Sequence, residues 1–300
     1  FLVPVLNTLV LLFPVPLIVL GVRRGVWAGI LGLIISSAII SIIIHPYLGF
    51  LVFIFNIIPL LGITWAFNKM MKANECVIVS SASILASTLI NFKAFELIIG
   101  KSFFDFISEN IQEFFTVNAE SSLALAQLYE SLGILDRVYS PEEFALLMAG
   151  QLKMLTPIVP SILLIFSIVA GVALFLLSRL ILKRFSIAVP YVPPFRNWAL
   201  PRGTGRGFLL IMIIAVIGMF MGINNFDIVL YTITALFSFI FFIQGLATAA
   251  FFLKASNLPQ IVQVLILIVA FIFMSAALSF IGLFEQIFGF RNAYSNRTRP

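Results

Sequence analysis

Long runs of uncharged, mainly apolar residues are the feature that most limits what this chain can fold into. A helix rises about 1.5 Å per residue, so roughly 20 such residues cross the ~30 Å hydrocarbon core of a bilayer. In lipid the backbone N–H and C=O groups of a spanning helix are satisfied within the helix itself. Runs of this length cover residues 1–20, 25–44, 48–67, 76–92, 154–178, 207–226, 228–253 and 255–284. The sequence therefore predicts an all-α, polytopic transmembrane helix bundle with about eight spans.

The composition agrees with that class. Hydrophobic residues make up 62% of the chain and charged residues 10%, and the mean hydropathy is +1.16. Soluble domains lie near half apolar and a quarter charged. We therefore expect residues 1–300 to form a single integral membrane domain, with N-terminal spans in 1–92 and C-terminal spans in 154–284. Prolines interrupt the first run and the chain does not begin with Met, so we expect its N-terminus to be processed or cropped.

Residues that usually carry metal or acid–base chemistry are scarce. The chain contains one cysteine, Cys76, and one histidine, His45. A single cysteine forms no intramolecular disulfide, and a zinc site needs several thiolate or imidazole ligands. We therefore expect no metal, no cofactor, no nucleic-acid partner and no enzymatic activity. A lipid-headgroup transferase that uses arginines and carboxylates at the interface stays open as an alternative.

The distribution of basic residues predicts how the chain is threaded. If Arg23 and Arg24 lie in the cytoplasm, most other basic residues of the short loops follow them there, as the positive-inside rule requires. These residues are Lys69, Lys72, Arg179, Lys183, Arg184, Arg196, Arg202, Arg206 and Lys254. The basic tail, with Arg291, then falls on the opposite side and is the one discordant feature. The balance predicts loop 183–206 in the cytoplasm and the long loop 93–153 outside.

Within the cytoplasmic loop, the stretch "VPPFRNWALPRGTGR" (192–206) combines prolines, aromatic residues and arginines without an acid. Its prolines disfavour a helix and favour extended geometry, and its aromatic side chains suit the headgroup level of a bilayer. One interpretation is a docking segment for a cytoplasmic partner. The other is a connector that lies on anionic lipid headgroups. The candidate docking residues are Pro193, Pro194, Phe195, Arg196, Trp198, Pro201 and Arg202.

The long loop 93–153 is large enough to form helices of its own. Apolar residues recur at helical spacing from Phe103 to Phe115, which predicts an amphipathic helix. Leu123, Leu128 and Leu132 indicate a second short helix, and "YSPEEF" (139–144) is a helix start with an N-cap serine and a capping-box glutamate. The predicted insert is either a cap on the ends of the spans or a lid over an outward-facing pocket.

Small residues mark faces on which helices approach closely, because lipid supplies little hydrophobic drive for helix association. The candidates are Gly21, Gly25, Gly29 and Gly32 in the second run and its preceding turn, and the GxxxG pair Gly218 and Gly222. Packing within the chain is the simpler interpretation. Docking of a separate membrane subunit is the alternative.

Polar residues inside the runs are the usual indicators of a transport site. The candidate ligand-binding residues are Asn56, Asn91, Lys93 and Glu96, with the last two spaced to form an ion pair on one helix. Hydrogen bonding between helices is the alternative role. Glu285 ends the last run, and we expect it to be solvated. The spans contain no chain of carboxylates, which argues against a proton-driven transporter.

Three stretches carry a family resemblance: "FPVPLIVLGVRRG" (13–25), "VPPFRNWALPR" (192–202) and "IGLFEQIFGFR" (281–291). With them the chain resembles the YybS-like family of bacterial multi-pass membrane proteins, classed as a domain of unknown function. The resemblance implies a bacterial inner-membrane location and a bundle of eight or nine helices. It supplies no activity.

More remotely, such proteins are similar to the substrate-binding membrane subunits of energy-coupling-factor transporters. Those subunits bind vitamins or metal ions from outside and depend on a membrane scaffold and cytoplasmic ATPases. This chain differs in its length, its long outer insert and its lack of an N-terminal histidine ligand. We therefore predict a non-enzymatic, ligand-binding or transporter-like subunit that docks a partner through its basic loop; alternatively, it is a structural protein of the cell envelope with no ligand.

Overall fold

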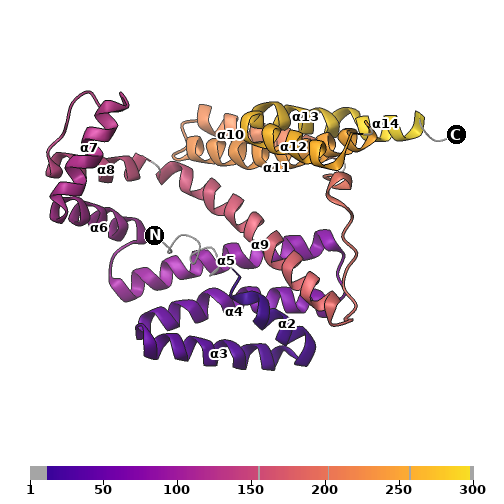
Figure 1. The fold of residues 1–300 in the computed structure, drawn as a ribbon, viewed down its shortest axis with the longest axis horizontal. Coiled ribbons are helices and arrows are strands. Elements are labelled where there is room, and N and C mark those ends of the chain that lie inside the picture. Colours follow the sequence, from indigo (N-terminus) through magenta and orange to yellow (C-terminus); the bar gives the residue numbers. More distant parts are fainter. Residues whose placement is uncertain (1–11, 155, 202, 257, 298–300) are drawn as a thin grey trace. The chain divides into compact units, whose positions relative to one another are not determined.

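The computed structural model describes residues 12–297 except 155, 202 and 257, and among these residues it is all-α without strands (Figure 1). The side chains of residues 152–156 and 295–297 lie outside the description, as does the predicted docking residue Arg202. The helices are α2 (Pro14–Arg24), α3 (Val26–Ile43), α4 (Pro46–Asn68), α5 (Ala73–Ile99), α6 (Phe103–Val117), α7 (Ala119–Ser131), α8 (Pro141–Met154), α9 (Val159–Arg184), α10 (Thr204–Phe220), α11 (Phe226–Ala255), α12 (Gln260–Phe273), α13 (Ser275–Phe288) and α14 (Phe290–Arg297), with short 3₁₀ turns η1 (Thr156–Ile158) and η2 (Phe195–Asn197).

Five of the helices in the described part of the chain are long and apolar enough to span a membrane: α3, α4, α5, α9 and α11. They coincide with five of the eight predicted runs and confirm the polytopic all-α class. The run 207–226 forms α10, a shorter apolar helix of 17 residues. The run 255–284 is not one helix, because α12 and α13 meet at Met274 with a bend of 105°. If that pair counts as one span, up to six spans are present among these residues.

Internal contacts group the chain into two units. The N-terminal unit contains residues up to Val159 together with Phe166–Pro190, and the C-terminal unit contains Pro160–Ile165 together with Tyr191–Pro300. Helix α9 contributes residues to both.

In the N-terminal unit, glycines bring α2, α3 and α4 into close contact. A Cβ atom on Gly29 would lie 3.0 Å from the Leu17 carbonyl oxygen and from a Leu60 methyl group, and one on Gly21 would lie 3.0 Å from Thr64 Oγ1. Gly32 faces the side chains of α2 in the same way. Gly25 differs from these three, because its φ of +97° places it in the turn between α2 and α3 with no neighbour within 4 Å. Its role is conformational, which corrects its assignment to a packing face.

The basic ends of α2 and α9 lie together in this unit. The Arg23 guanidinium lies 3.9 Å from the centre of the Phe185 ring, just after α9. Arg179 Nε donates to the Pro190 carbonyl at 2.7 Å and so holds the chain that leaves α9. Two basic segments that the sequence assigned to one side of the membrane are therefore neighbours.

The insert forms three helices, α6, α7 and α8, at the end of α5. The predicted start of α8 is confirmed: Glu143 N donates to Ser140 Oγ at 3.2 Å, and Ser140 N donates to Glu143 Oε2 at 3.1 Å. Phe144 is buried against Phe115 and Tyr129.

The apolar face predicted for the middle helix of the insert is not the one that packs. Leu123, Leu128 and Leu132 are exposed, whereas Ser122 and Ala126 are buried. Ser122 Oγ donates to the Phe115 carbonyl at 2.5 Å. Small residues let α7 approach its neighbours closely, so the leucines are left on the surface.

In the C-terminal unit, α11 packs against α10 and most extensively against α13. The α11–α13 crossing is glycine-mediated: a Cβ on Gly245 would overlap the Leu278 carbonyl, and one on Gly282 would overlap the Phe241 carbonyl. Gly218 contacts the Phe226 ring at the α10–α11 turn, and Gly222 lies in that turn with φ +69°. Of the GxxxG pair, Gly218 therefore allows close contact between α10 and the first residue of α11, whereas Gly222 has a conformational role in the turn.

Candidate ligand site in the C-terminal unit

The Pro/Trp segment, residues 191–203, leads into α10, and its described residues form no α-helix, as its prolines predict. The 3₁₀ turn η2 lies within this segment. Trp198 Nε1 donates to the Pro193 carbonyl at 3.0 Å, and the rings of Phe195 and Trp198 meet edge to face at 5.3 Å. The segment thus has a defined conformation.

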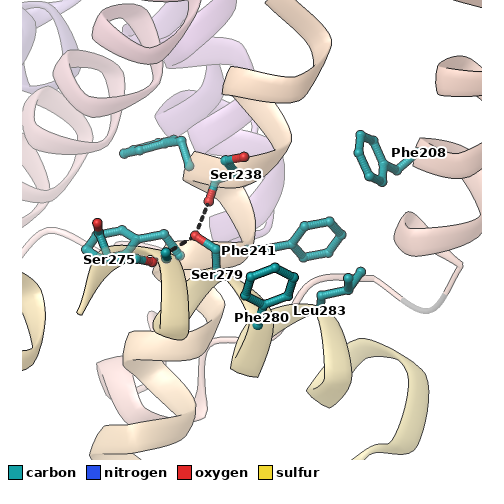
Figure 2. A pocket seen from close by; sticks show the side chains of 10 residues that line it. Phe208, Ser238, Phe241, Ser275, Ser279, Phe280 and Leu283 are labelled. Atoms are coloured by element: carbon teal, nitrogen blue, oxygen red, sulfur yellow. Dashed lines mark hydrogen bonds between the residues drawn. The ribbon is translucent and has the colours of Figure 1, made fainter. Parts of the chain in front are cut away.

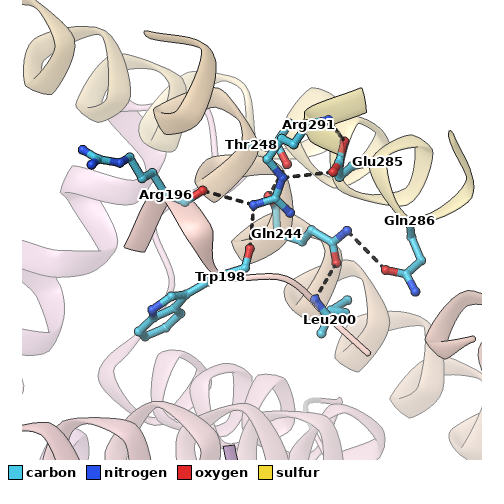
Figure 3. Close-up of polar contacts among 8 residues, drawn as sticks. All are labelled: Arg196, Trp198, Leu200, Gln244, Thr248, Glu285, Gln286 and Arg291. Atoms are coloured by element: carbon cyan, nitrogen blue, oxygen red, sulfur yellow. Dashed lines mark hydrogen bonds and ion pairs between the residues drawn. The ribbon is translucent and has the colours of Figure 1, made fainter. Parts of the chain in front are cut away.

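A buried ion pair lies beside this segment. Arg291 Nε donates to Glu285 Oε1 at 3.0 Å, and the Arg291 backbone N–H donates to Glu285 Oε2 at 3.3 Å (Figure 3). The two side chains are only 9% and 6% exposed. The expectation that Glu285 is solvated was wrong. Gly289, which has φ +64°, ends α13 in the left-handed conformation, and Arg291, two residues later, contacts Glu285 in the last turn of α13.

The same arginine fixes the Pro/Trp segment. Arg291 Nη1 donates to the carbonyls of Arg196 at 3.1 Å and Trp198 at 2.8 Å. Arg291 of the basic tail therefore lies beside the Pro/Trp segment in this unit. The side of the membrane that each of them faces stays a prediction.

Two glutamines continue the network. Gln244, which is 4% exposed, accepts from Leu200 N at 3.4 Å and donates from Nε2 to Gln286 Oε1 at 3.3 Å. Gln286 Nε2 donates to the Pro201 carbonyl at 2.8 Å. The two side chains thus join α11, α13 and the Pro/Trp segment, as Figure 3 shows.

These groups line a cavity of about 960 Å³, called here the polar cavity. Its walls come from the Pro/Trp segment, the start of α10, the middle of α11 and the end of α13 with the residues that follow. Its polar side chains belong to Arg206, Gln244, Glu285, Gln286, Arg291 and Asn292. Three of these side chains, Gln244, Glu285 and Arg291, are buried, and burial of such polar groups is stable only when they are hydrogen-bonded, as they are in the network above.

Figure 2 shows side chains that line a second cavity of about 510 Å³, called here the apolar cavity. Phe208 and Leu283 line both. The other lining residues are Ser238, Phe239, Phe241, Phe242, Ser275, Ala276, Ser279 and Phe280. Ser279 Oγ donates to the carbonyls of Ser238 and Ser275, each at 3.0 Å, so its hydroxyl is already engaged within the protein. The cavity wall is therefore dominated by phenylalanine rings.

The four residues predicted to bind a ligand lie in the N-terminal unit, and the structure divides them. Asn56 Nδ2 donates to the Val52 carbonyl at 2.7 Å, and Asn91 Nδ2 donates to the Ser87 carbonyl at 3.2 Å. Both asparagines therefore bond their own helices. Lys93 and Glu96 form an exposed ion pair at 2.9 Å. The two asparagines are thus bonded within their own helices, and the lysine and glutamate are paired with each other at the surface.

The predicted docking residues are partly engaged within the C-terminal unit. The carbonyls of Arg196, Trp198 and Pro201 accept hydrogen bonds from the tail and from α13. The side chains of Pro194 and Arg196 are exposed, and Figure 3 shows the Arg196 guanidinium turned away from the cluster. These two side chains are therefore accessible, while the backbone of the segment is held by hydrogen bonds from Gln286 and Arg291.

Sequence reasoning missed Gln286 and the part played by Arg206 in the polar cavity. The available signal was modest: Glu285, Gln286 and Arg291 are the polar residues of an otherwise apolar closing stretch, and Gly289 between them can end a helix. Among the described residues, no three His, Cys, Asp or Glu side chains lie close enough to share a metal ion.

Comparison with known proteins gives the relationship of the chain. The family model described as "Predicted membrane protein (DUF2232)" matches residues 1–285. The chain is 24% identical over 301 residues to "Uncharacterized protein YybS" of Bacillus subtilis (strain 168), and this match covers 97% of the chain and 91% of that protein. No solved structure matches. The predicted resemblance to the YybS-like family is confirmed, whereas a likeness to energy-coupling-factor subunits stays a prediction.

Proposed function

Because the chain belongs to the DUF2232 family of predicted membrane proteins, we propose that it is a non-enzymatic membrane protein that binds an amphiphilic molecule in its C-terminal unit. The bound molecule places its polar end in the polar cavity and its apolar part in the apolar cavity. The protein then acts as a binding subunit of the bacterial cytoplasmic membrane.

One observation carries this proposal: the two cavities share lining residues, and only one of them is lined by charged and amide side chains. Phe208 and Leu283 line both, so the two cavities meet at these side chains. One side of that boundary has arginine and amide groups, and the other has phenylalanine rings. Small-molecule sites in proteins are usually apolar clefts of roughly 300–1,000 Å³ with a few placed polar groups. Both cavities fall within that range.

Filling the apolar cavity tests the proposal. The full-length protein would be purified in mild detergent, and the amphiphiles retained would be extracted and quantified by mass spectrometry. Ala276 lines the apolar cavity, so Ala276→Trp should reduce the retained amphiphile by about ten-fold, as a loss of ~1.4 kcal/mol would. Ala255→Trp is the matched control, because this alanine is exposed at the end of α11 and lines neither cavity.

Two results would contradict amphiphile binding. One is a wild-type protein that retains no amphiphile above the level found with an unrelated membrane protein. The other is equal retention by Ala276→Trp and Ala255→Trp. Either result would favour the alternative function, a structural protein of the cell envelope without a ligand.

We also propose that the Pro/Trp segment faces the cytoplasm and docks a partner through exposed side chains such as that of Arg196. The basic tail supports this orientation, because Arg291 bonds the segment and its charge now counts toward the same side. Asn197→Cys in a Cys76→Ala background would be labelled with a membrane-impermeant maleimide. Labelling in inverted vesicles but not in intact cells is expected, and the reverse pattern would overturn the orientation.

The docking role has its own test, affinity purification from the native host. Arg196→Ala removes only an exposed side chain, so it should deplete a co-purifying protein without loss of thermal stability. A set of co-purifying proteins unchanged by this substitution would contradict docking through Arg196.

A further inference from the structure

We infer that the polar end of the bound amphiphile carries a phosphate group, and that Arg206 is its main contact. This inference rests on the proposed function and names the class of ligand: an anionic membrane phospholipid. It is argued from the charges and hydrogen-bonding groups of the polar cavity.

The charges in the cavity wall do not cancel. The ionisable side chains that line it are Arg206, Glu285 and Arg291. Glu285 and Arg291 pair with each other at 3.0 Å and are buried, so they offset one another. Arg206 is exposed to the cavity and makes no ion pair or side-chain hydrogen bond with any residue that the structure describes. One positive charge is therefore left for a ligand.

The remaining polar groups of the wall add donors. The Asn292 side-chain amide bonds none of the described residues. Gln286 Nε2 has two N–H groups and gives one to the Pro201 carbonyl, which leaves the other. A guanidinium together with amide N–H groups suits a ligand that has several acceptor oxygens and a negative charge. Phosphate has these properties, and arginine binds it through two parallel hydrogen bonds.

Other polar groups at the end of the bound amphiphile would fit the polar cavity less well than a phosphate. A quaternary ammonium group needs an acid or an aromatic cage, but Glu285, the one carboxylate in the wall, is already paired with Arg291. A fatty-acid carboxylate could pair with Arg206 but would occupy little of about 960 Å³. A phosphodiester together with its glycerol and its headgroup alcohol would fill more of the cavity. Basic pockets between transmembrane helices are known to hold anionic lipid headgroups.

Binding measurements on the full-length protein in detergent test this inference by native mass spectrometry. The probes are dioleoyl phosphatidylglycerol, dioleoylglycerol, oleate and glycerol phosphate. Dioleoylglycerol has the same chains without the phosphate, oleate replaces the phosphate with a carboxylate, and glycerol phosphate lacks the chains. Phosphatidylglycerol should bind about ten-fold more tightly than dioleoylglycerol, since a charge-assisted pair is worth about that factor. It should also bind more tightly than oleate and glycerol phosphate, because these fill less of the two cavities.

Substitution of Arg206 tests whether this side chain contacts the phosphate. Arg206→Gln should weaken phosphatidylglycerol binding about ten-fold and leave dioleoylglycerol binding unchanged. Lys254→Gln is the matched control, because it removes a positive charge at the exposed end of α11 that lines neither cavity. Equal losses in the two variants would show attraction to surface charge only and would overturn the site.

The probes separate failure of this inference from failure of the proposed function. If phosphatidylglycerol and dioleoylglycerol bind equally and Ala276→Trp weakens both, amphiphile binding stands and the phosphate inference is wrong. Oleate that binds as tightly as phosphatidylglycerol overturns the inference in the same way. If glycerol phosphate alone binds as tightly as phosphatidylglycerol, or if Ala276→Trp changes nothing, the proposed function itself fails.

Discussion

The two units use their buried polar side chains in different ways. In the N-terminal unit these side chains mostly bond their own helix: Asn56 donates to Val52, Thr88 to Ile84 and Ser80 to Cys76, each four residues back. In the C-terminal unit Gln244 and Arg291 bond partners 42 to 95 residues away. Local bonds satisfy a polar group without shaping a site. Long-range bonds fix several segments around a space, and here that space is the polar cavity.

The buried ion pair should show the largest effect of any single substitution. Arg291→Met leaves Glu285 buried without its partner, which typically costs about 3–5 kcal/mol. Lys101→Met is the matched control in the N-terminal unit, because the Lys101–Glu109 pair is about half exposed on each side chain and should cost less than ~1 kcal/mol. Thermal unfolding in detergent would measure both.

The double variant Glu285→Met/Arg291→Met sharpens this comparison. With neither charge present no uncompensated carboxylate remains, so the double variant should be more stable than Arg291→Met alone. A double variant as unstable as the single one would mean that the loss arises elsewhere, for example from the unbonded carbonyls of Arg196 and Trp198.

Substitutions of glycines at the helix crossings should have the next largest effects on stability. Gly282→Ala places a methyl group into the Phe241 carbonyl, so α11 and α13 must move apart, at a cost of about 1–3 kcal/mol or more. Gly29→Ala in the N-terminal unit meets neighbours at 3.0 Å and should cost less. Gly207→Ala, on α10 with nothing within 4 Å, should stabilise by up to about 1 kcal/mol. Midpoints of thermal unfolding would rank the three, and a different order would contradict the geometry.

Much of the fold could be predicted because hydropathy and capping act locally. Five uncharged runs became spanning helices, and Ser140 and Glu143 cap α8 as their spacing predicts. The bend at Met274 could not be predicted, since neither proline, glycine nor charge marks it within the run. Glycine spacing alone also did not distinguish Gly29, which contacts a helix, from Gly25, which has a positive φ.

The candidate site was harder to predict because it is made by partners distant in the sequence. Gln244 is a polar residue within an apolar run, but nothing near it in the sequence indicates Gln286 or Leu200. Glu285 was expected to be solvated because it ends an apolar run, and the break between α13 and α14 at Gly289 lets Arg291 pair with it. Hydropathy places residues along one helix and does not determine which helices meet.

Single polar-to-apolar substitutions test the difference between the units directly. Gln244→Leu leaves the Leu200 N–H without its acceptor, which should cost about 1–3 kcal/mol. Asn56→Leu should be neutral or stabilising, because Asn56 Oδ1 is buried without a partner and the Val52 carbonyl stays in its helix. Equal effects on the unfolding midpoint would contradict the contrast between local and long-range bonds.

The smallest expected effect lies in the insert and depends on pH. The Ser140 backbone N–H, with Arg137 nearby, lowers the pKa of Glu143 below the ordinary value of about 4.3. A lowered folded-state pKa means that the carboxylate stabilises the start of α8 above the unfolded-state pKa. This contribution is lost as the pH falls through the folded-state value. Glu143→Gln should therefore speed hydrogen exchange at the start of α8 a few-fold at pH 7, relative to wild type.

That difference should shrink once both proteins are studied below about pH 4, after correction for intrinsic exchange rates. Glu142→Gln is the matched control, because it removes a neighbouring charge on the same turn but not the bond to Ser140. A Glu143→Gln effect that persists unchanged at low pH would mean that the side chain acts through its shape and not through its charge. The C-terminal unit should show no change in exchange with Glu143→Gln at any pH, since its polar network is separate from this cap.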